Sequence, residues 1–313
     1  MDSPISSPLV SVVLLAYNQP EFLNQAIEGV CAQTFTDYEL LVIDDCSGEE
    51  ITSQYRLPEN ARLIILPEHF GWDTRGRNVG VKEAKGKFIA FHDNDDIWLP
   101  DKLETQVRLL NENPDAALAY CHYIFTDSTL KPLPKQYKSE PPARDMVRQI
   151  IQGCFLHCAS TILVKRDALT ATGPFDESLP GGTDWDMWIR LSINHRFLCD
   201  PTPRILYRTH PNQISKNLRQ EFWRIAVLTN TLDLIKRVSP KHTNCVRSRL
   251  SWACRKMAKI RMSNAEPLPD ISALLIKAMN VWPWSWKTYA LFAWLPFYRL
   301  SIISSRKQNN RSK

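Results

Sequence analysis

Three aspartates directly follow a short apolar stretch in the first third of the chain. Residues 88–91, Phe-Ile-Ala-Phe, lead through His92 into Asp93, Asp95 and Asp96. Carboxylates grouped in this way repel one another, and a divalent cation relieves both this repulsion and the cost of burying charge. Mg²⁺ and Mn²⁺ prefer carboxylate oxygens and commonly reach substrate phosphates as well. We therefore predict a metal–phosphate site at Asp93 and Asp95.

A solvated acidic turn is the alternative explanation of this cluster. It would cap the helix that we expect to begin near Asp101, because acidic side chains are common before helices. A second strand also ends in acidic residues, because the apolar run Tyr38–Ile43 is followed by Asp44 and Asp45. Two acidic strand ends are less readily explained as two unrelated helix caps. In a parallel sheet the carboxyl ends of the strands share one edge, where open α/β sheets bind their ligands.

The elements that must position these carboxylates are short apolar runs alternating with amphipathic segments. We predict strands at 10–15, 38–43, 61–66 and 88–92, and helices at 21–32 and 74–84. This alternation predicts right-handed βαβ units and an α/β fold with a mainly parallel sheet flanked by helices.

The chain after the acidic cluster continues in mixed α/β style and then becomes helical. We predict helices at 101–113, 144–152 and 184–191, strands at 116–125, 160–164 and 204–208, and a surface loop over 126–142. From about residue 221 helical periodicity dominates and β-like alternation disappears. The Cys154–Cys158 segment lacks a second ligand pair, so we predict no structural zinc site there.

The charge of the chain is unevenly distributed. The net charge is +6, but residues 241–313 contain 14 Lys/Arg and only two acids, Glu266 and Asp270. The same region is rich in Trp and Tyr, which favour the membrane–water interface, while Lys and Arg favour anionic lipid. We therefore expect attachment to the cytoplasmic membrane surface, the alternative being a helical layer packed on the catalytic domain or on a second subunit.

Two further features indicate the compartment. No signal segment opens the chain, and no window reaches the roughly 18 apolar residues of a membrane span. The eight cysteines are scattered over 313 residues, which is typical of reduced thiols rather than of a disulfide framework. We expect a cytoplasmic protein, peripheral on the inner face of the membrane.

Five separated motifs occur in an order that resembles family 2 glycosyltransferases, the inverting GT-A group that builds bacterial surface polysaccharides. They are Ser11–Asn18, Val42–Ser47, Arg77–Gly80, Phe91–Asp96 and Thr183–Asp186. The resemblance covers about Val10 to Ser215. It implies a GT-A-like catalytic domain over residues 8–215, followed by a helical, basic, Trp-rich extension over residues 216–313.

The resemblance also implies roles for particular residues. Ala16 and Tyr17 would line the nucleotide site, Asp45 would bind the base of a nucleotide such as uridine, and Arg77 would lie near the nucleotide. Asp93 and Asp95 match the Asp-x-Asp metal motif, with Asp95 the direct ligand of Mn²⁺ or Mg²⁺. Asp184 matches the catalytic base, and His210 matches a group presented to the diphosphate or the metal.

The sequence departs from the family pattern at several positions. Leu15-Ala16 replaces a Pro-Thr pair, Cys46 replaces the Gly after the paired aspartates, and Thr183 replaces the Glu before the base. No Gln-x-x-Arg-Trp motif follows, which argues against a processive synthase.

The residues themselves are compatible with one chemical step. A metal held by carboxylates can neutralise a leaving diphosphate, and a carboxylate can take the proton of an attacking hydroxyl. Asp184 is suited to be that base because the start of a helix favours the ionised form. Plain capping by Asp184, with Asp186 as the base, is the alternative.

The resemblance, together with these residues, implies a metal-dependent, inverting, non-processive glycosyltransferase. Its partners would be a nucleotide-diphosphate sugar, most readily of the UDP type, and a glycan or polyprenyl-linked acceptor, with no nucleic acid. A homodimer is one option for the oligomeric state. A non-catalytic sugar- or nucleotide-binding protein on the same fold is the rival hypothesis.

Overall fold

A computed structural model describes residues 7–71, 73–137, 144–210 and 219–296. Contacts within the chain divide it into two units. The first comprises Met1–Ser178 and Thr183–Ile214, and the second comprises Leu179–Gly182 and Ser215–Lys313. Each unit is described by itself below.

The first unit is an α/β structure whose elements follow the predicted alternation. Its strands are β1 (Val10–Ala16), β2 (Tyr38–Asp44), β3 (Ala61–Ile65), β4 (Phe88–Asp93), β5 (Ile97–Trp98), β6 (Ala116–Thr126), β7 (Pro132–Tyr137), β8 (Ile162–Lys165) and β9 (Arg196–Arg208). Its helices are α1 (Pro20–Cys31), α2 (Glu49–Thr52), α3 (Asp73–Glu83), α4 (Lys102–Glu112), α5 (Met146–Gln152), α6 (Arg166–Thr172) and α7 (Thr183–Ser192).

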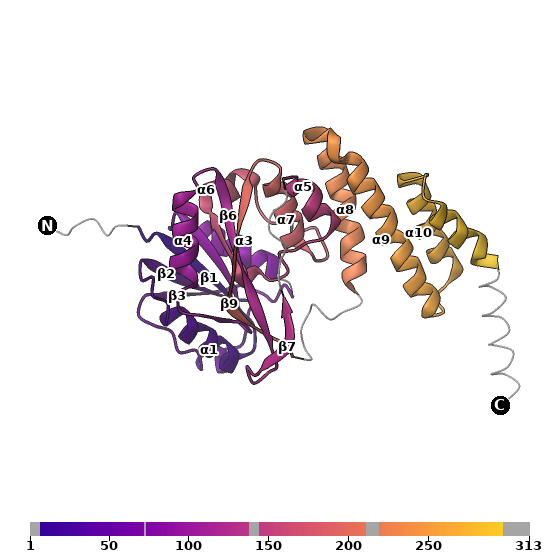
Figure 1. The fold of residues 1–313 in the computed structure, drawn as a ribbon. Coiled ribbons are helices and arrows are strands. Elements are labelled where there is room, and N and C mark those ends of the chain that lie inside the picture. The colour runs from indigo at the N-terminus through magenta and orange to yellow at the C-terminus, as the bar shows by residue number, and fades with distance from the viewer. Residues whose placement is uncertain (1–6, 72, 138–143, 211–218, 297–313) are drawn as a thin grey trace, which may run out of the picture. The chain divides into compact units, whose positions relative to one another are not determined.

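These strands form a single sheet with the order β3-β2-β1-β4-β8-β6-β9-β5, and β7 pairs with β6. Figure 1 labels β1, β2, β3, β6, β7 and β9 of this sheet. The first four strands of this order are parallel to one another, as are β6 and β9. Antiparallel pairs join β8 to β4 and to β6. The mainly parallel α/β fold predicted from the sequence is confirmed.

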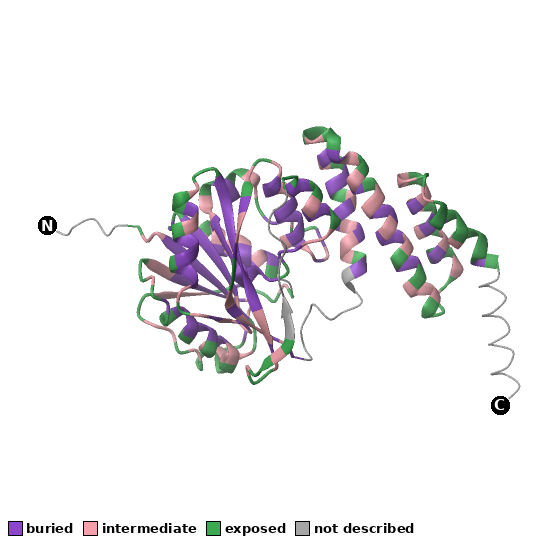
Figure 2. Ribbon diagram, viewed as in Figure 1, coloured by how far each residue is buried: buried purple, intermediate pink, exposed green. Residues whose placement is uncertain are grey.

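One face of the sheet is covered by α1 and α4. Alternate residues of β1, among them Val12 and Leu14, are fully buried in one cluster with Ile27 of α1 and Leu103 of α4. Strand residues point alternately to the two faces, so this period-two set is the one that packs on these helices. The strands β1, β2, β4, β6 and β8 are buried along most of their length, and Figure 2 shows purple ribbon through the middle of the sheet.

The opposite face of β1 packs on α3. A Cβ atom added at Gly80 of α3 would lie 2.2 Å from Cγ1 of Val13, so only glycine allows this close approach of helix and strand. Phe91 of β4 contributes to the same side, where its ring contacts Phe175 and Trp188. Helices therefore cover both faces, as expected for a parallel sheet.

Several elements differ from the sequence-based expectation. Residues 132–137, expected within a loop, form β7, because they pair with β6 instead of extending into solvent. β9 begins at Arg196 rather than 204, and α6 was not expected at all. The strand expected from Ser160 begins at Ile162, after a 3₁₀ turn over Ala159–Thr161. Residues 138–143 of the expected loop lie outside the described part of the chain.

The second unit is helical, as the loss of β-like alternation predicted. It contains α8 (Arg219–Val238), α9 (Thr243–Ser263) and α10 (Leu268–Val281), followed by a helix over residues 286–296. Its core includes Ala258, Ile271, Leu275 and Leu295. Among the described residues, no helix combines the length and the apolar character that crossing a membrane requires.

Candidate functional site

The two acidic strand ends lie at the same edge of the sheet, on either side of β1. In the register of the strands, Ala16 is opposite Asp44 of β2 and Leu15 is opposite Asp93 of β4. The residues that follow β1, beginning with Tyr17, therefore leave the sheet between the two acidic ends. This edge is where open α/β sheets bind ligands.

Tyr17, Asp45 and His69 form a compact group, which we call the aromatic–acid group. The His69 ring stacks on the Tyr17 ring with centroids 4.1 Å apart and an interplanar angle of 11°. His69 Nδ1 lies 2.8 Å from Asp45 Oδ2. Asp45 also accepts backbone N–H groups of Phe70 (3.0 Å) and Gly71 (3.1 Å). Asp45 thus holds the segment after β3 against the segment after β2, and His69 brings that segment to Tyr17 after β1.

Two left-handed residues shape the loops around this group. Cys46 has φ 64° and Asn18 has φ 49°. Cys46 stands where the family pattern has glycine, and the positive φ explains that preference because glycine carries no Cβ. The backbone N–H of Asn18 donates to Ser47 Oγ over 2.9 Å, which ties the loop after β1 to the loop after β2.

Arg77 of α3 joins several of the acidic side chains. Its buried guanidinium lies 2.6 Å from Asp73 Oδ2 and 3.3 Å from Asp93 Oδ1. Burial disfavours the charged guanidinium, but the negative charges of Asp73, Asp93 and Asp184 raise the Arg77 pKa above its ordinary value. Arg77 is therefore a fixed cation that pairs with the start of α3 and the end of β4, and its charge also acts on Asp184 at the start of α7.

Asp184 is the second residue of α7 and is half-buried. Burial raises its pKa, Arg77 opposes this rise, and its Oδ1 accepts the N–H of Trp185 over 2.7 Å. Thr183, which replaces the family's glutamate, is buried with its hydroxyl 3.0 Å from that of Thr74 in α3. This contact fixes the start of α7 against α3 without a second carboxylate.

Asp186, the alternative base, has a different environment. Its Oδ2 accepts from Arg190 Nε over 2.8 Å, one turn later in α7. Arg190 also donates to the carbonyl groups of Thr172 and Pro174. Asp186 therefore serves the packing of α7 on the preceding segment.

Asp95 is held from two directions. Its Oδ2 lies 3.1 Å from His210 Nε2. Its backbone carbonyl accepts from Arg208 Nε over 2.9 Å, and Arg208 also donates to Gln25 Oε1 and to the Ser128 carbonyl, each over 2.6 Å. The end of β9 thus fixes the position of the acidic loop.

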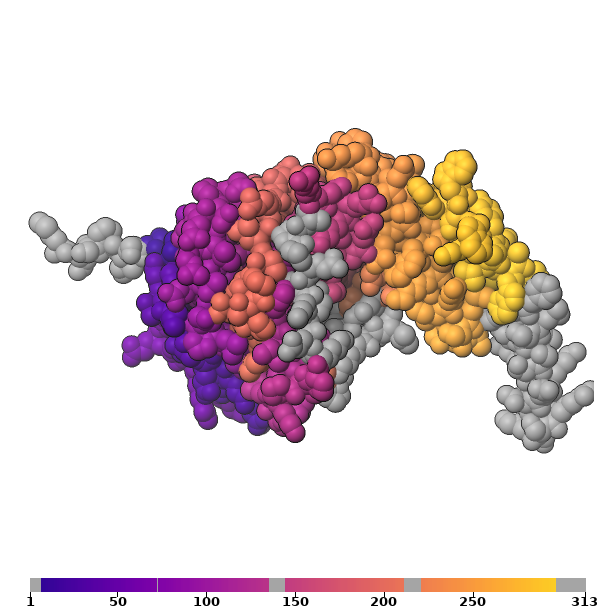
Figure 3. Space-filling model, viewed as in Figure 1, coloured from indigo at the N-terminus to yellow at the C-terminus, as the bar shows by residue number. Residues whose placement is uncertain are grey.

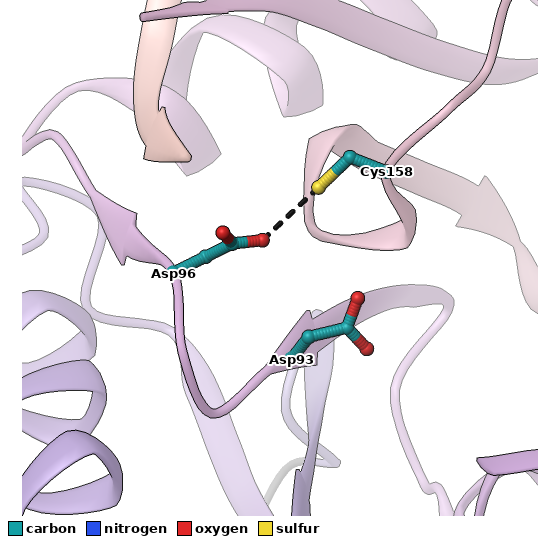
Figure 4. A group of neighbouring side chains, drawn as sticks. All are labelled: Asp93, Asp96 and Cys158. Carbon is teal, nitrogen blue, oxygen red and sulfur yellow. Dashed lines mark hydrogen bonds between the residues drawn. The ribbon is translucent and has the colours of Figure 1, made fainter. Parts of the chain in front are cut away.

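Asp96 is buried. It accepts from Ser160 Oγ (2.6 Å) and from Cys158 Sγ (3.0 Å), as Figure 4 shows for the thiol. Burial raises the pKa of Asp96 well above its usual range and raises that of Cys158 as well. Asp93, Asp96 and Cys158 bring their ligand atoms within 4.8 Å of one another.

The carboxylates at the end of β4 fit a hard divalent cation. Burial raises the pKa of Asp93 to about 7, and the neighbouring charge of Asp95 adds to this rise while Arg77 opposes it. Asp95 and Asp93 likewise raise the pKa of Asp96. This excess of negative charge is what a cation would neutralise, and oxygen donors suit Mg²⁺ or Mn²⁺. Cys158 is a soft ligand and does not suit these ions.

Most predicted site residues share this edge of the sheet. Arg77 contacts Asp93 and its charge acts on Asp184, while His210 contacts Asp95. Tyr17 approaches Asp45 through His69. Ala16 is buried, and its carbonyl accepts the N–H of Asp45 over 2.9 Å.

Sequence reasoning missed His69, Asp73, Cys158 and Arg208. The one available signal was for His69, which follows the third strand and therefore falls at the same sheet edge.

Comparison with known protein families identifies a match over about half of the chain. The model of the family described as "Glycosyl transferase family 2" matches residues 11–173. An uncharacterised glycosyltransferase of Rickettsia prowazekii is 30% identical over 226 residues, covering 68% of each chain. WfgD of Escherichia coli, named a UDP-Glc:alpha-D-GlcNAc-diphosphoundecaprenol beta-1,3-glucosyltransferase, is 28% identical over 69% of this chain and 83% of its own.

Solved structures share the fold. TarS of S. aureus in complex with UDP-GlcNAc aligns with a TM-score of 0.68 and 18% identity, over 87% of this chain and 81% of TarS. The mannosyltransferase PcManGT of Pyrobaculum calidifontis, solved with GDP-Man and Mn²⁺, aligns with a TM-score of 0.57 and 18% identity, over 92% and 79% of the two chains. At identities this low, the alignments establish similarity of fold alone.

Proposed function

The chain belongs to glycosyl transferase family 2, and from this premise we propose that it transfers a sugar from a nucleotide-diphosphate donor to an acceptor hydroxyl in the synthesis of cell-surface polysaccharide. We propose a single displacement with inversion, because one base and one leaving diphosphate suffice for it. Residues 8–215 would form the catalytic domain and residues 216–313 the helical extension.

The donor is proposed to be a UDP-sugar. TarS has been solved with UDP and with UDP-GlcNAc, and WfgD is named for the donor UDP-Glc. In this chain the aromatic–acid group offers a ring and a carboxylate at the sheet edge, which suits a planar base with N–H and carbonyl groups. We assign Ala16, Tyr17 and Asp45 to this part of the donor.

The acceptor is proposed to be a glycan or a lipid-linked sugar. WfgD is named for a diphosphoundecaprenol-linked GlcNAc, which supports a polyprenyl-linked acceptor here. Such an acceptor resides in a membrane, so we propose that the enzyme works at the cytoplasmic membrane face. A homodimer stays a separate proposal.

Asp93 and Asp95 are proposed to hold Mn²⁺ or Mg²⁺. Bound there, the ion would neutralise charge on the leaving diphosphate. His210 is proposed to face the diphosphate beside Asp95. The crowding of negative charge at the end of β4 supports this assignment, and so does PcManGT, which shares the fold and was solved with Mn²⁺.

Asp184 is proposed to take the proton of the acceptor hydroxyl. A base with a pKa nearer to neutrality than that of an ordinary carboxylate accepts a proton more readily in the transition state. The burial that raises the Asp184 pKa therefore supports this role, while Arg77 keeps the ionised form accessible.

The observation that carries the proposal is the arrangement around Arg77. One buried guanidinium lies beside Asp93, the proposed metal ligand, and its charge also acts on Asp184, the proposed base. This grouping of residues far apart in the sequence supports the proposal that the leaving group and the acceptor hydroxyl meet there.

A donor panel tests the proposal. Binding and slow hydrolysis of UDP-, GDP- and CDP-sugars would be measured for the full chain with Mn²⁺, with Mg²⁺ and with EDTA. We expect one UDP-sugar to bind and to be hydrolysed only with metal, and Asp95→Ala to lose hydrolysis. Binding without hydrolysis or transfer would favour the rival, a non-catalytic binding protein. Absence of nucleotide binding under every condition would refute the donor site.

A further inference from the structure

The last described helix, residues 286–296, has apolar side chains on two opposite faces. Its inner face contributes Leu291 and Leu295 to the core of the second unit, with Ala258, Ile271 and Leu275. Its outer face is exposed, and the ribbon there is mostly green in Figure 2. A helix that is apolar all round normally has both faces covered, so the outer face indicates a partner.

The outer face is aromatic. On the helix Trp286 is 72% exposed, Trp294 51%, Tyr289 47% and Phe292 37%, and Trp284, in the turn just before it, is 83% exposed. We call these five side chains the aromatic face. The adjoining Ala290 and Ala293 are exposed as well, and Lys287 is the single charged side chain between residues 281 and 296. In Figure 3 this part of the chain, in yellow, lies at the visible surface.

The aromatic face is part of an ordered element. Arg255 of α9 donates to Ser285 Oγ over 2.9 Å and to Thr288 Oγ1 over 3.1 Å. Thr288 is fully buried. These contacts fix the start of the helix against α9, so the exposed rings are held on the side opposite to the core.

The surrounding sequence is basic. α9 contains six Lys/Arg and no Asp or Glu, and residues 297–313 contain five Lys/Arg and no acid. The acids of the second unit are partly engaged already, because Glu221 pairs with Lys256 and Asp270 with Arg261. A partner that meets this region encounters exposed aromatic rings beside an excess of positive charge.

We propose that the aromatic face docks on the surface of an anionic phospholipid bilayer. Trp and Tyr rings favour the interface between headgroups and acyl chains, and Lys and Arg are attracted to anionic lipid. A helix with these properties lies in the plane of the interface rather than across it. Two copies packed through this face would bring like positive charges together, whereas an anionic surface complements them.

This inference rests on the proposed function for its purpose, which is to bring the enzyme to a lipid-linked acceptor. Its evidence is independent of the sheet edge. Membrane binding and donor hydrolysis can therefore succeed or fail separately, and both are measured on each variant.

The test is co-sedimentation of the full chain with vesicles. One set contains phosphatidylcholine alone and the other contains phosphatidylcholine with phosphatidylglycerol. We expect binding to the anionic vesicles, weakened by high salt. The variant Trp286→Ser/Trp294→Ser should reduce the partition coefficient at least about tenfold, since it removes two large apolar side chains from the contact. Its hydrolysis of free donor in solution should stay as in wild type.

A matched control is Phe222→Ser, which removes an exposed aromatic ring from α8 in the same unit. It should leave vesicle binding unchanged. On the wild-type chain, quenching of Trp fluorescence by lipids brominated near the headgroup provides a readout that needs no substitution.

Three results would overturn the proposal. The first is failure to bind anionic vesicles. The second is an equal effect of Phe222→Ser and of Trp286→Ser/Trp294→Ser. The third is a dimer in light scattering that the double variant dissociates, because a second copy would then cover the aromatic face. Loss of donor hydrolysis with vesicle binding intact would instead count against the proposed function.

Discussion

Two adjacent aspartates at the end of β2 have different hydrogen-bond partners and different roles. Asp44 is fully buried and accepts the N–H (2.6 Å) and hydroxyl (2.8 Å) of Ser47 and the hydroxyl of Tyr55 (2.6 Å). It therefore holds its own loop together. Asp45 faces the segment after β3, where it contacts His69 and two backbone N–H groups. The identity of a residue does not determine which of these roles it takes.

Asp45→Ala should weaken UDP binding. Without the carboxylate the backbone N–H groups of Phe70 and Gly71 lose their acceptor, and His69 loses the partner that orients it. We expect the Kd for UDP, measured by calorimetry, to rise about 10- to 100-fold, the equivalent of one or two charge-assisted hydrogen bonds. Glu50→Ala, an exposed acid on α2, serves as the control. An unchanged Kd for Asp45→Ala would remove Asp45 from the donor site.

The sequence allowed most residues of the site to be predicted, but not their partners. The position after strands pointed to Asp45, Asp93 and Asp95, because the end of a buried apolar run indicates where a strand ends. It could not predict that Asp96 turns inward to Cys158, since that contact depends on a 3₁₀ turn about 60 residues later. Such contacts arise from tertiary packing rather than from local pattern.

At the scale of elements, the packing of α3 on β1 positions Arg77. The helix approaches the strand closely at Gly80, where Val13 fills the space that a side chain would need. Gly76, one turn earlier, faces Leu15 in the same way, with an added Cβ 3.0 Å from Leu15 Cδ2. Small residues on one face of α3 thus set the depth at which its guanidinium is buried.

Gly80→Ala should destabilise the protein by about 1–3 kcal/mol, as overpacking of a tight core does. Chemical denaturation in urea would measure the change. Val13→Ala in the Gly80→Ala background should restore part of the loss, because it vacates the contested space. Gly48→Ala, with nothing within 4 Å and an extended backbone, is the control and should change stability by less than about 0.5 kcal/mol. Equal effects of the two substitutions would contradict a packing constraint at Gly80.

A buried lysine in α4 connects packing to pH. Lys102 Nζ donates to Gln106 Oε1 over 2.8 Å and lies 4.0 Å from the centre of the Trp98 ring. Burial lowers its pKa from 10.5 to about 8. Between these two values the unfolded chain binds a proton that the folded chain does not. The contribution of Lys102 to the free energy of unfolding therefore rises as the pH increases from about 8 to 10.5, by up to about 3 kcal/mol.

Lys102→Met should flatten this dependence. Free energies of unfolding in urea at pH 8 and pH 10 would be compared for wild type, Lys102→Met and Lys241→Met, an exposed control. We expect the wild type and the control to gain stability relative to Lys102→Met between the two pH values. The same pH dependence in all three proteins would show that Lys102 titrates normally.

The strand and helix pattern could be predicted where one period dominates. β1, β2 and β4 were expected within a residue or two, since each is a buried apolar run. β7 was not expected, because Pro132, Pro134 and Lys135 favour a loop locally and only pairing with β6 makes the segment a strand. β9 begins eight residues before the predicted strand at 204–208 for a similar reason, because its first part pairs in parallel with β6.

At the scale of the molecule, two units with different chemistry share one chain. The first unit has the acidic sheet edge, and the second has the basic helices and the aromatic face. The compositional shift near residue 221 indicated the change of structure. It could not distinguish aromatic side chains that pack inward from those that stay exposed, because both kinds follow the same helical period.

Amide hydrogen exchange would show which of the two units binds the nucleotide. Binding of UDP with Mn²⁺ should slow amide exchange after β1, at residues 69–71 and after β4, because a ligand protects the state it binds. Exchange in α9 and α10 should stay unchanged. Equal protection of both units, or protection confined to the helices, would contradict a donor site at the sheet edge.

Asp184 as the base of a sugar transfer is the assignment on which the proposed function depends most. The direct measurement is the single-turnover rate of UDP release from the donor identified by the panel, with a lipid-diphosphate-linked sugar as acceptor, for wild type, Asp184→Asn and Asp186→Asn. We predict that Asp184→Asn slows release about 10²- to 10⁴-fold with donor affinity retained, as expected for loss of a general base. Asp186→Asn should stay within about threefold of wild type, because its carboxylate pairs with Arg190. A rate for Asp184→Asn within about threefold of wild type, or a larger loss in Asp186→Asn, would contradict the assignment.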